Sequence, residues 1–237
     1  MLFLPAFNGS TTVRVVPISN LVALEKHTKA TELITHILSS YHYKKTELND
    51  ELSDAIFKNY LENLDQNKAY FISSDIKAFE KFRHSIDDRI KNSDISLAFD
   101  IFKQYRKRVE ERINYALEII DYDFDFSVQE SFRFDRRDDN WIGNILDLNE
   151  LWRKRVKNDV LNLKLTGKNL SDIKKTLSKR YSRILSTTLQ LDSNDIFQTF
   201  INAYTTSIEP HTSYFSPRIS ENFDISMRLS LEGIGAV

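Results

Sequence analysis

Apolar residues recur every three or four positions over most of this chain, and this spacing restricts its fold more than any other feature. The longest run follows Asp94 and keeps the period for about seven turns, which predicts a long amphipathic helix. Its apolar positions are Leu97, Ala98, Ile101, Phe102, Tyr105, Val109, Ile113, Ala116, Leu117 and Ile120. Side chains at this spacing share one face of a helix. We therefore expect this helix to be the spine of an all-α domain.

The same period predicts three helices before the spine. Candidate N-caps are Asn20 for the first, Asn49 or Asp50 for the second, and Ser73 or Ser74 for the third, because their side chains can accept bonds from the free N–H groups of a first turn. The residues expected to face inward are Leu21, Leu24, Leu33, Ile34, Ile37, Leu38 and Tyr41 in the first, Leu52, Ile56, Phe57, Tyr60, Leu61 and Leu64 in the second, and Ile76, Phe79, Phe82, Ile86 and Ile90 in the third.

Three more helical patterns follow the spine. They comprise Leu151, Trp152, Val156 and Val160, then Leu170, Ile173, Leu177, Tyr181, Ile184 and Leu185, and finally Ile196, Phe197, Phe200, Ile201, Tyr204 and Ile208 behind Ser193 or Asn194. Gly167 separates the first two. The sum is about seven helices in a domain that spans residues 20–208.

Two stretches lack the helical period. Residues 121–148 begin with DYDFDF, which alternates acidic and aromatic residues, so we expect a long irregular crossing there. Residues 1–19 contain Pro5, Gly9 and Pro17 and are predicted to be a leader or an expression-derived segment. The chain has only 5 Gly and 4 Pro, fewer than a fold built from many β-hairpins normally needs, which also favours helices.

Charge and composition argue against several partners. The chain carries 33 basic and 34 acidic residues, so no overall field attracts it to nucleic acid or to an anionic membrane. Glu110 and Glu111 interrupt the basic run of residues 103–112, which we interpret as a solvated helix face. No apolar run approaches the roughly 20 residues that span a bilayer, so we expect no membrane insertion. The balanced charge leads us to expect no nucleic-acid partner.

The sequence offers no catalytic or metal-binding motif. DYDFD resembles the start of a calcium loop, but Phe126 and Phe132 stand where that loop requires Gly and a bidentate Glu. No two His residues stand at i, i+4 with a Glu between them, and the chain has no Cys, so we predict no metal and no cofactor. No G-x-S-x-G motif and no Ser/Lys arrangement is present, and we predict that no residue of this chain is catalytic.

The carboxyl end, RLSLEGIGAV, is the one glycine-rich stretch. Gly233 and Gly235 flank Ile234, and two close glycines allow successive N–H groups to form an anion-binding nest. A flexible chain end is the alternative interpretation.

Several segments, in order, resemble one family. SLEGIGAV is similar to the opening of the PDZ domain of tail-specific proteases, EPHTSYFSP (residues 209–217) is similar to the segment that leads into that domain, and LKLTGK (residues 163–168) matches part of the family's helical domain. Residues 41–65 resemble its opening helices. Glu209 stands where the family usually has Asp.

This resemblance implies a specific role for each part of the chain. Residues 20–208 would be the helical N-terminal domain of a tail-specific protease, and residues 209–237 a linker followed by the first strand and carboxylate loop of a truncated PDZ domain. Gly233, Ile234, Gly235 and Ala236 would bind the C-terminal carboxylate of a substrate.

The resemblance also implies a periplasmic serine endopeptidase whose Ser/Lys dyad lies beyond this chain, so the chain alone should be inactive. Its partners would be protein substrates with apolar C-terminal tails and a tetratricopeptide-repeat lipoprotein adaptor, and its own role would be to enclose substrate and dock the adaptor. The alternative is a stand-alone helical scaffold that binds another protein without enzymatic activity.

Overall fold

The structure, a computed structural model, describes residues 14–228, and every regular element within that range is helical. The α-helices are α1 (Glu25–Ser40), α2 (Asp50–Asp65), α3 (Ser73–Glu80), α4 (Ile86–Lys91), α5 (Ser96–Ile119), α6 (Ile145–Leu165), α7 (Leu170–Gln190), α8 (Ser193–Ile208) and α9 (Pro217–Arg228), and a 3-10 helix, η1, covers Ile18–Asn20. The predicted all-α class is confirmed.

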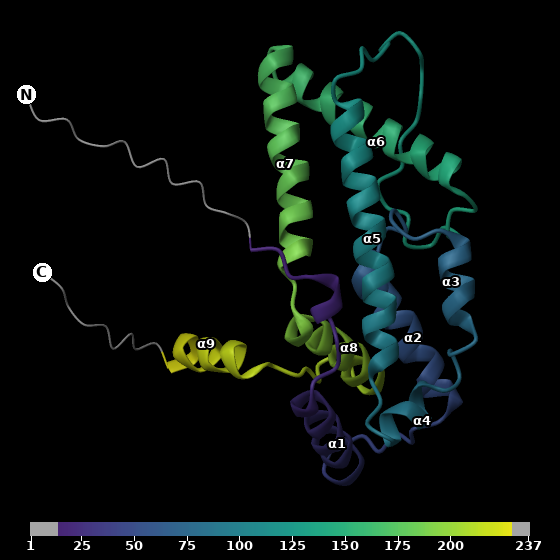
Figure 1. The fold of residues 1–237 in the computed structure, drawn as a ribbon, viewed down its shortest axis with the longest axis vertical. Coiled ribbons are helices and arrows are strands. Elements are labelled where there is room, and N and C mark those ends of the chain that lie inside the picture. The colour runs from purple at the N-terminus through teal and green to yellow at the C-terminus, as the bar shows by residue number, and fades with distance from the viewer. Residues whose placement is uncertain (1–13, 229–237) are drawn as a thin grey trace, which may run out of the picture.

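Helix α5 is the spine of the domain, as predicted. Figure 1 shows it upright through the middle of the molecule, with α7 beside it and α1, α4 and α8 towards its lower end. Its first half packs with α1, α2, α4 and α8 into one buried cluster, which we call the lower cluster. Its second half packs with α6 and α7 into another, the upper cluster. One helix therefore belongs to both halves of the core.

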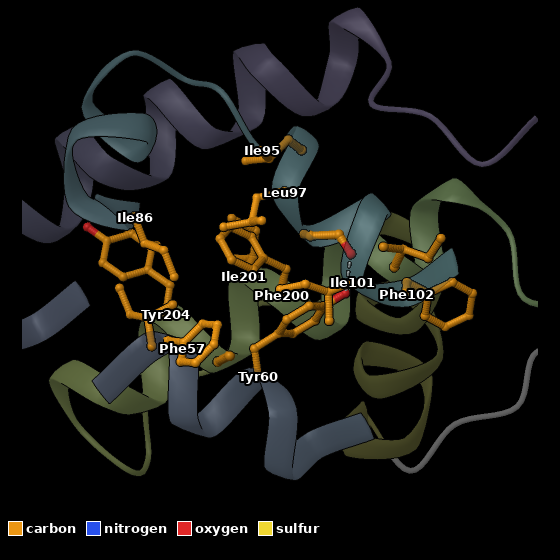
Figure 2. Packing of buried hydrophobic residues seen from close by; sticks show 14 of the residues in the cluster. Phe57, Tyr60, Ile86, Ile95, Leu97, Ile101, Phe102, Phe200, Ile201 and Tyr204 are labelled. Atoms are coloured by element: carbon orange, nitrogen blue, oxygen red, sulfur yellow. Dashed lines mark hydrogen bonds between the residues drawn. The ribbon is translucent and has the colours of Figure 1, made fainter. Parts of the chain in front are cut away.

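The lower cluster is rich in aromatic residues (Figure 2). Tyr60 of α2 lies edge-on to Phe200 of α8, with 5.3 Å between ring centroids. The buried Tyr60 hydroxyl donates a hydrogen bond of 2.9 Å to the backbone carbonyl of Ala98 in α5. This bond satisfies the polar end of an otherwise apolar contact and joins three helices that are distant in sequence.

Helix α1 begins later than the sequence predicts. Asn20 lies in η1 instead of capping α1, and Ser193 of α8 explains why: its hydroxyl donates to the Asn20 carbonyl at 3.1 Å and accepts the Val22 N–H at 3.2 Å. The N-cap position falls on Leu24, whose N–H donates to Nδ1 of His27 at 3.2 Å. The side chain three residues into the helix thus supplies the cap.

His27 fixes α1 to α8. Its ring is buried and stacks on Phe197 with 4.6 Å between centroids, and its Nε2–H donates to Asn194 Oδ1 at 3.1 Å. Burial lowers the pKa of His27, which favours the neutral ring that these two hydrogen bonds require.

The inward face of α1 also differs from the prediction. Leu33, Ile37 and Tyr41, expected in the core, are 59%, 45% and 76% exposed. Leu38 is buried as expected, together with the polar residues His27 and Thr31. Because α1 packs with one side against α4 and α8, its second apolar stripe remains on the surface.

The predicted third helix is divided into α3 and α4. Ser53 of α2 accounts for the break, because its hydroxyl donates to the carbonyl of Arg83 at 2.9 Å and accepts the N–H of Ile86 at 2.8 Å. A polar group from another helix thereby satisfies backbone groups that a continuous helix would have paired internally.

The turn after α2 is held by one buried carboxylate. Asp65 is 3% exposed and accepts three backbone N–H groups at 2.8 to 2.9 Å, from Ala69, Tyr70 and Phe71. Burial raises the pKa of Asp65, and these N–H donors oppose the shift. Lys68 adopts a positive φ of 47°, so the chain reverses sharply around the carboxylate.

The same turn holds the carboxyl half of the domain. The indole N–H of Trp152, a fully buried residue of α6, donates to the Ala69 carbonyl at 2.6 Å. Ser73 follows the turn, and it donates through its N–H to the Ile142 carbonyl at 2.8 Å and through its hydroxyl to the Trp141 carbonyl at 2.9 Å. The turn therefore fixes both α6 and the crossing that precedes it.

The expected irregular crossing covers residues 121–144, and α6 begins at Ile145 behind the N-cap Asn144. Gly167 separates α6 from α7 as predicted, with a positive φ of 82° that favours glycine.

The two ends of the predicted helical domain show differences. Residues 14–19, which the sequence analysis assigns to a leader, are attached to the core: Val16 donates its N–H to the Leu189 carbonyl at 2.9 Å, and its carbonyl accepts from Arg106 at 2.6 Å. Residues 209–216 contain no helix, and a turn at Pro210 and His211 is closed by a bond of 3.0 Å from the Thr212 N–H to the Glu209 carbonyl. Helix α9, which was not predicted from the sequence, follows them. Pro217 at its first position has a φ suited to helix initiation. The predicted PDZ strand lies in the part of the chain beyond residue 228, outside the described residues.

The Asp65 carboxylate should be required for stability. Replacing it by Ala would leave three buried N–H groups unpaired, at roughly 1 to 3 kcal/mol each, so we expect Asp65→Ala to lower the free energy of unfolding in urea by on the order of 3 kcal/mol or more. Asp65→Asn keeps one acceptor oxygen and should lose less. The control is Glu62→Ala on the exposed side of α2, with an expected change within about 0.5 kcal/mol. Equal losses in Asp65→Ala and Glu62→Ala would contradict this role.

Candidate functional site

Residues 209–216, which we call the exit segment, lead from α8 to α9 and are held by side chains of α8. The Tyr214 N–H donates to Asn202 Oδ1 at 2.7 Å, and the Ser216 N–H donates to Gln198 Oε1 at 3.4 Å. Gln198 and Asn202 stand four residues apart, so both amides lie on one face of α8. They accept backbone N–H groups at alternate positions of the segment, much as a neighbouring strand would.

His42 fixes the start of the exit segment from the other side. Its Nε2 lies 2.9 Å from the Thr212 hydroxyl, and its Nδ1 lies 3.0 Å from the carbonyl and 3.2 Å from the N–H of Lys44. That hydroxyl donates in turn to Glu209 Oε2 at 3.2 Å, and Glu209 also accepts the His211 N–H at 2.8 Å. The polar residues of EPHTSYFSP therefore form a local network that joins the α1–α2 connection to the end of α8.

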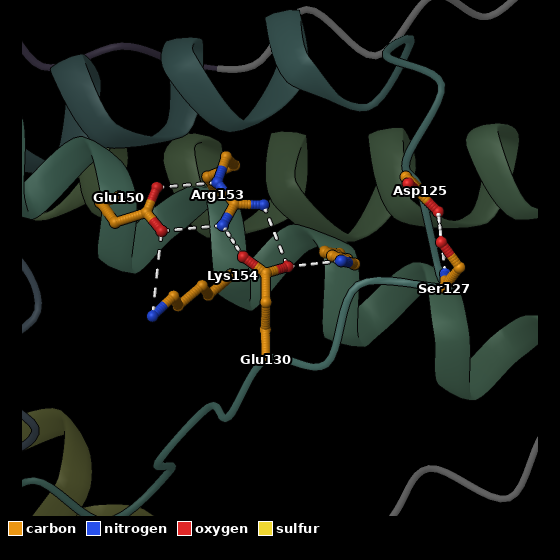
Figure 3. A network of polar contacts seen from close by, with 7 residues as sticks. Asp125, Ser127, Glu130, Glu150, Arg153 and Lys154 are labelled. Atoms are coloured by element: carbon orange, nitrogen blue, oxygen red, sulfur yellow. Dashed lines mark hydrogen bonds and ion pairs between the residues drawn. The ribbon is translucent and has the colours of Figure 1, made fainter.

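An ion-pair network holds the irregular crossing against α6 (Figure 3). Glu130 of the crossing pairs with both Arg153 and Lys157 of α6, and Arg153 also pairs with Glu150 at 2.7 Å. Hydrogen bonds from Arg153 and then Lys157 lower the pKa of Glu130 to about 2, so this carboxylate stays ionised at neutral pH.

The acidic residues of DYDFD do not converge on a cation site. Asp121 pairs with Lys174 of α7 at 2.9 Å, and Asp125 accepts the N–H of Ser127 at 2.8 Å. No group of three metal-ligating side chains comes together within residues 14–228. Phe124 and Phe126 pack against the upper core cluster, which explains the alternation of acidic and aromatic residues.

The basic run of α5 does not form a continuous charged surface. Arg106 and Arg112 are only 4% and 5% exposed. Arg112 donates to Asn149 Oδ1, and Arg108 pairs with the buried Asp75 at 2.8 Å. The run therefore serves packing between elements more than the solvated face that the sequence suggests.

Two histidines contact hydroxyl groups, His42 with Thr212 and His36 with Ser40, the latter at 3.5 Å on the exposed side of α1. Neither histidine has a carboxylate among its hydrogen-bond partners in the described part of the chain, so neither pair has the third group that orients the base of an activated nucleophile.

Of the helices that the structure describes, none combines the length and apolarity needed to cross a membrane. The predicted substrate-binding residues Gly233, Ile234, Gly235 and Ala236 lie outside the described residues.

Comparison with known proteins identifies the family. The family model described as "Tail specific protease N-terminal domain" matches residues 34–218, which include all of α2 to α8 and the exit segment. The chain belongs to the tail-specific protease N-terminal domain family. It is also similar to a tail-specific protease of Haemophilus influenzae, with 40% identity over 233 residues. That alignment covers 98% of this chain but 34% of the relative, so the chain spans about a third of that protein's length.

The contacts of the exit segment were not predicted from the sequence of this tail-specific protease N-terminal domain. The resemblance marks residues 209–217, but it does not reveal that Gln198, Asn202 and His42 hold them. The available signal is the pair of amides four residues apart on α8, since such side chains can bond to neighbouring backbone.

Removing one α8 amide should loosen the exit segment alone. We expect Asn202→Ala to raise the hydrogen-exchange rate of the Tyr214 amide by roughly tenfold or more, because its acceptor is lost while the helix remains. Mass spectrometry or NMR can resolve this rate. The control is Thr199→Ala, because Thr199 bonds only to the Asp195 carbonyl within α8 among the described hydrogen bonds. Unchanged exchange at Tyr214 in Asn202→Ala would show that Asn202 does not hold the segment.

Proposed function

We propose that this chain is the substrate-enclosing and adaptor-docking domain of a periplasmic tail-specific serine endopeptidase. The enzyme would recognise apolar C-terminal tails through a PDZ domain and cleave with a Ser/Lys dyad supplied by sequence beyond this chain. The observation that best supports the proposal is the similarity of nearly the whole chain to about a third of a tail-specific protease.

The exit segment supports the placement of this domain relative to the rest of such an enzyme. Side chains from α8 and from the α1–α2 connection fix residues 209–216, so the chain leaves the helical domain in a defined direction. A peptidase that encloses its substrate needs a fixed relation between the enclosing domain and the domain that follows it. A flexible linker would not provide this relation.

The outer face of α1 is the surface that we propose for adaptor docking. Leu33, Ile37 and Tyr41 stand four residues apart in series, so they form one apolar stripe along the helix, and all three are largely exposed. A stripe at this spacing suits a groove between the helices of a repeat protein, where an amphipathic helix buries its apolar side. A tetratricopeptide-repeat lipoprotein has such grooves.

The catalytic part of the proposal predicts that the chain alone is inactive. An apolar-tailed substrate protein would be incubated with this chain and with a version extended through the downstream protease sequence. We expect cleavage only by the extended version, because peptide hydrolysis needs a nucleophile, a base and an oxyanion site held together. A substrate whose final apolar residues are replaced by Asp should resist cleavage. Activity of the short chain that survives repurification and is absent from a mock preparation would falsify the assignment of catalysis to the missing part.

The docking part predicts that the chain binds a helical-repeat adaptor without the protease core. Calorimetry should detect this binding, and Ile37→Ser should weaken it by roughly tenfold, as expected for an apolar contact near the centre of an interface. Leu165→Ser is the matched control, because Leu165 is 77% exposed at the end of α6, away from α1. Equal weakening by both variants would rule out the α1 stripe, and no heat at high micromolar adaptor would reject docking by this domain.

A further inference from the structure

A hollow between the irregular crossing and helices α6 and α7 gathers four arginines. It has a volume of about 160 Å³ and is lined by Arg133 and Arg136 of the crossing, Arg155 of α6 and Arg180 of α7. The one carboxylate in its lining is Asp159. The charged side chains of the lining itself are therefore mostly arginines.

Three of the four arginines already have carboxylate partners. Arg133 and Arg136 share a single carboxylate, Asp139, at 2.8 and 3.0 Å. Arg180 lies 3.6 Å from Asp159, which already accepts the Tyr181 hydroxyl at 2.7 Å. The positive charges of Arg133 and Arg136 also act on Asp135 and Asp65, so nearby carboxylates already offset these two arginines.

Arg155 is the arginine best prepared to bind a ligand. Its guanidinium carbon lies 4.6 Å from the ring centroid of Trp152, which is fully buried and hydrogen-bonded to the Ala69 carbonyl. No carboxylate among the described residues forms an ion pair with Arg155. A guanidinium placed over a fixed aromatic ring presents its N–H donors at its edge. Arg155 hydrogen-bonds to the Tyr70 side chain, and its remaining donors match the oxygens of a carboxylate.

Apolar groups complete the wall of the hollow. Phe132 and Phe134 lie edge to face with 4.8 Å between centroids, and Phe134 is 61% exposed. Leu151 of α6 and Ile184 of α7 also line the hollow. A free phosphate ion would gain nothing from contact with these apolar side chains. A peptide that carries a carboxylate next to an apolar residue would contact both the arginines and the apolar side chains.

We propose that this hollow is a binding site for a peptide carboxylate flanked by an apolar side chain. The carboxylate pairs with Arg155 and Arg180, and the apolar side chain packs on Phe132 and Phe134. The lining residues are different from Gly233 to Ala236, the residues predicted to bind a substrate carboxylate. The proposal does not depend on the peptidase assignment, because binding to this chain requires no cleavage.

The test measures binding of three short fluorescent peptides to the chain by anisotropy. The first has one Glu beside one Leu and an amidated end, the second has Gln in place of Glu, and the third has Gln and a free C-terminal carboxylate beside Leu. We expect the first or third peptide to bind at least roughly tenfold more tightly than the second, as charge-assisted pairing to an arginine implies, and comparison of these two shows whether the carboxylate comes from a side chain or a chain end.

Variants locate the binding within the chain. Arg155→Met retains most of the side-chain volume over Trp152 but removes the charge, and it should weaken the preferred peptide by roughly tenfold or more. Lys175→Met removes one positive charge from an exposed position of α7 that does not line the hollow, and it should change binding by less than about twofold. Circular dichroism and thermal melting of both variants confirm that they are folded.

Three outcomes would overturn the proposal. One is equal affinity for all three peptides. Another is equal weakening by Arg155→Met and Lys175→Met. The third is binding of inorganic phosphate in a chain that binds no carboxylate peptide at millimolar concentration. If Arg155→Met fails to fold, Phe134→Ser, which changes a largely exposed side chain, must weaken the preferred peptide for the proposal to stand.

Discussion

The fold depends on a carboxylate that is almost completely removed from water. Asp65 accepts the backbone N–H groups of three successive residues after α2, and the reversal that it stabilises presents the Ala69 carbonyl to Trp152 and then directs the chain to the backbone around Trp141 and Ile142. Burying a charge is expensive unless it is fully hydrogen-bonded, and here each bond also places part of a second element. A local turn thus determines where α6 and the crossing lie.

Helix α5 and this turn join the two halves of the core in complementary ways. α5 contributes apolar residues to both buried clusters, so the halves share a common wall. The turn adds directional hydrogen bonds between α2 and α6. Arg106 and Arg112 extend this pattern, because they leave the helix at buried positions to bind the Val16 carbonyl and Asn149. The binding surfaces that we propose lie on elements supported by this framework: the α1 stripe, the exit segment, and the hollow beside Trp152.

The sequence predicts those features whose cause is local. The spacing of Leu97 to Ile120 is sufficient to predict α5. Gly167 marks a helix end because glycine, without a Cβ, readily adopts the positive φ found there. Features that depend on a distant partner could not be predicted. Asn20 has the chemistry of an N-cap, but Ser193, far along the chain, hydrogen-bonds to the Asn20 carbonyl and the Val22 N–H, and α1 begins later. Likewise, Leu33 and Ile37 fit an apolar face, and the positions of α4 and α8 determine which side of α1 is covered. The predicted PDZ loop lies outside the described residues, and the contacts of Asn202 and Arg155 arise only when separate elements meet.

The two core clusters differ in how far apart their members lie along the chain. The buried members of the upper cluster run from Ile72 to Tyr181, whereas those of the lower cluster run from Leu21 to Ile208, because that cluster needs both α2 and α8. During synthesis from the amino end, the upper cluster can close as soon as α7 has emerged. At that point α1 and α2 still lack α8, one of their partners in the lower cluster. The aromatic surface of α2, including Phe57 and Tyr60, must remain unaggregated during this interval. The order of helices along the chain therefore leaves the apolar faces of α1 and α2 without part of their partner surface until α8 has been made.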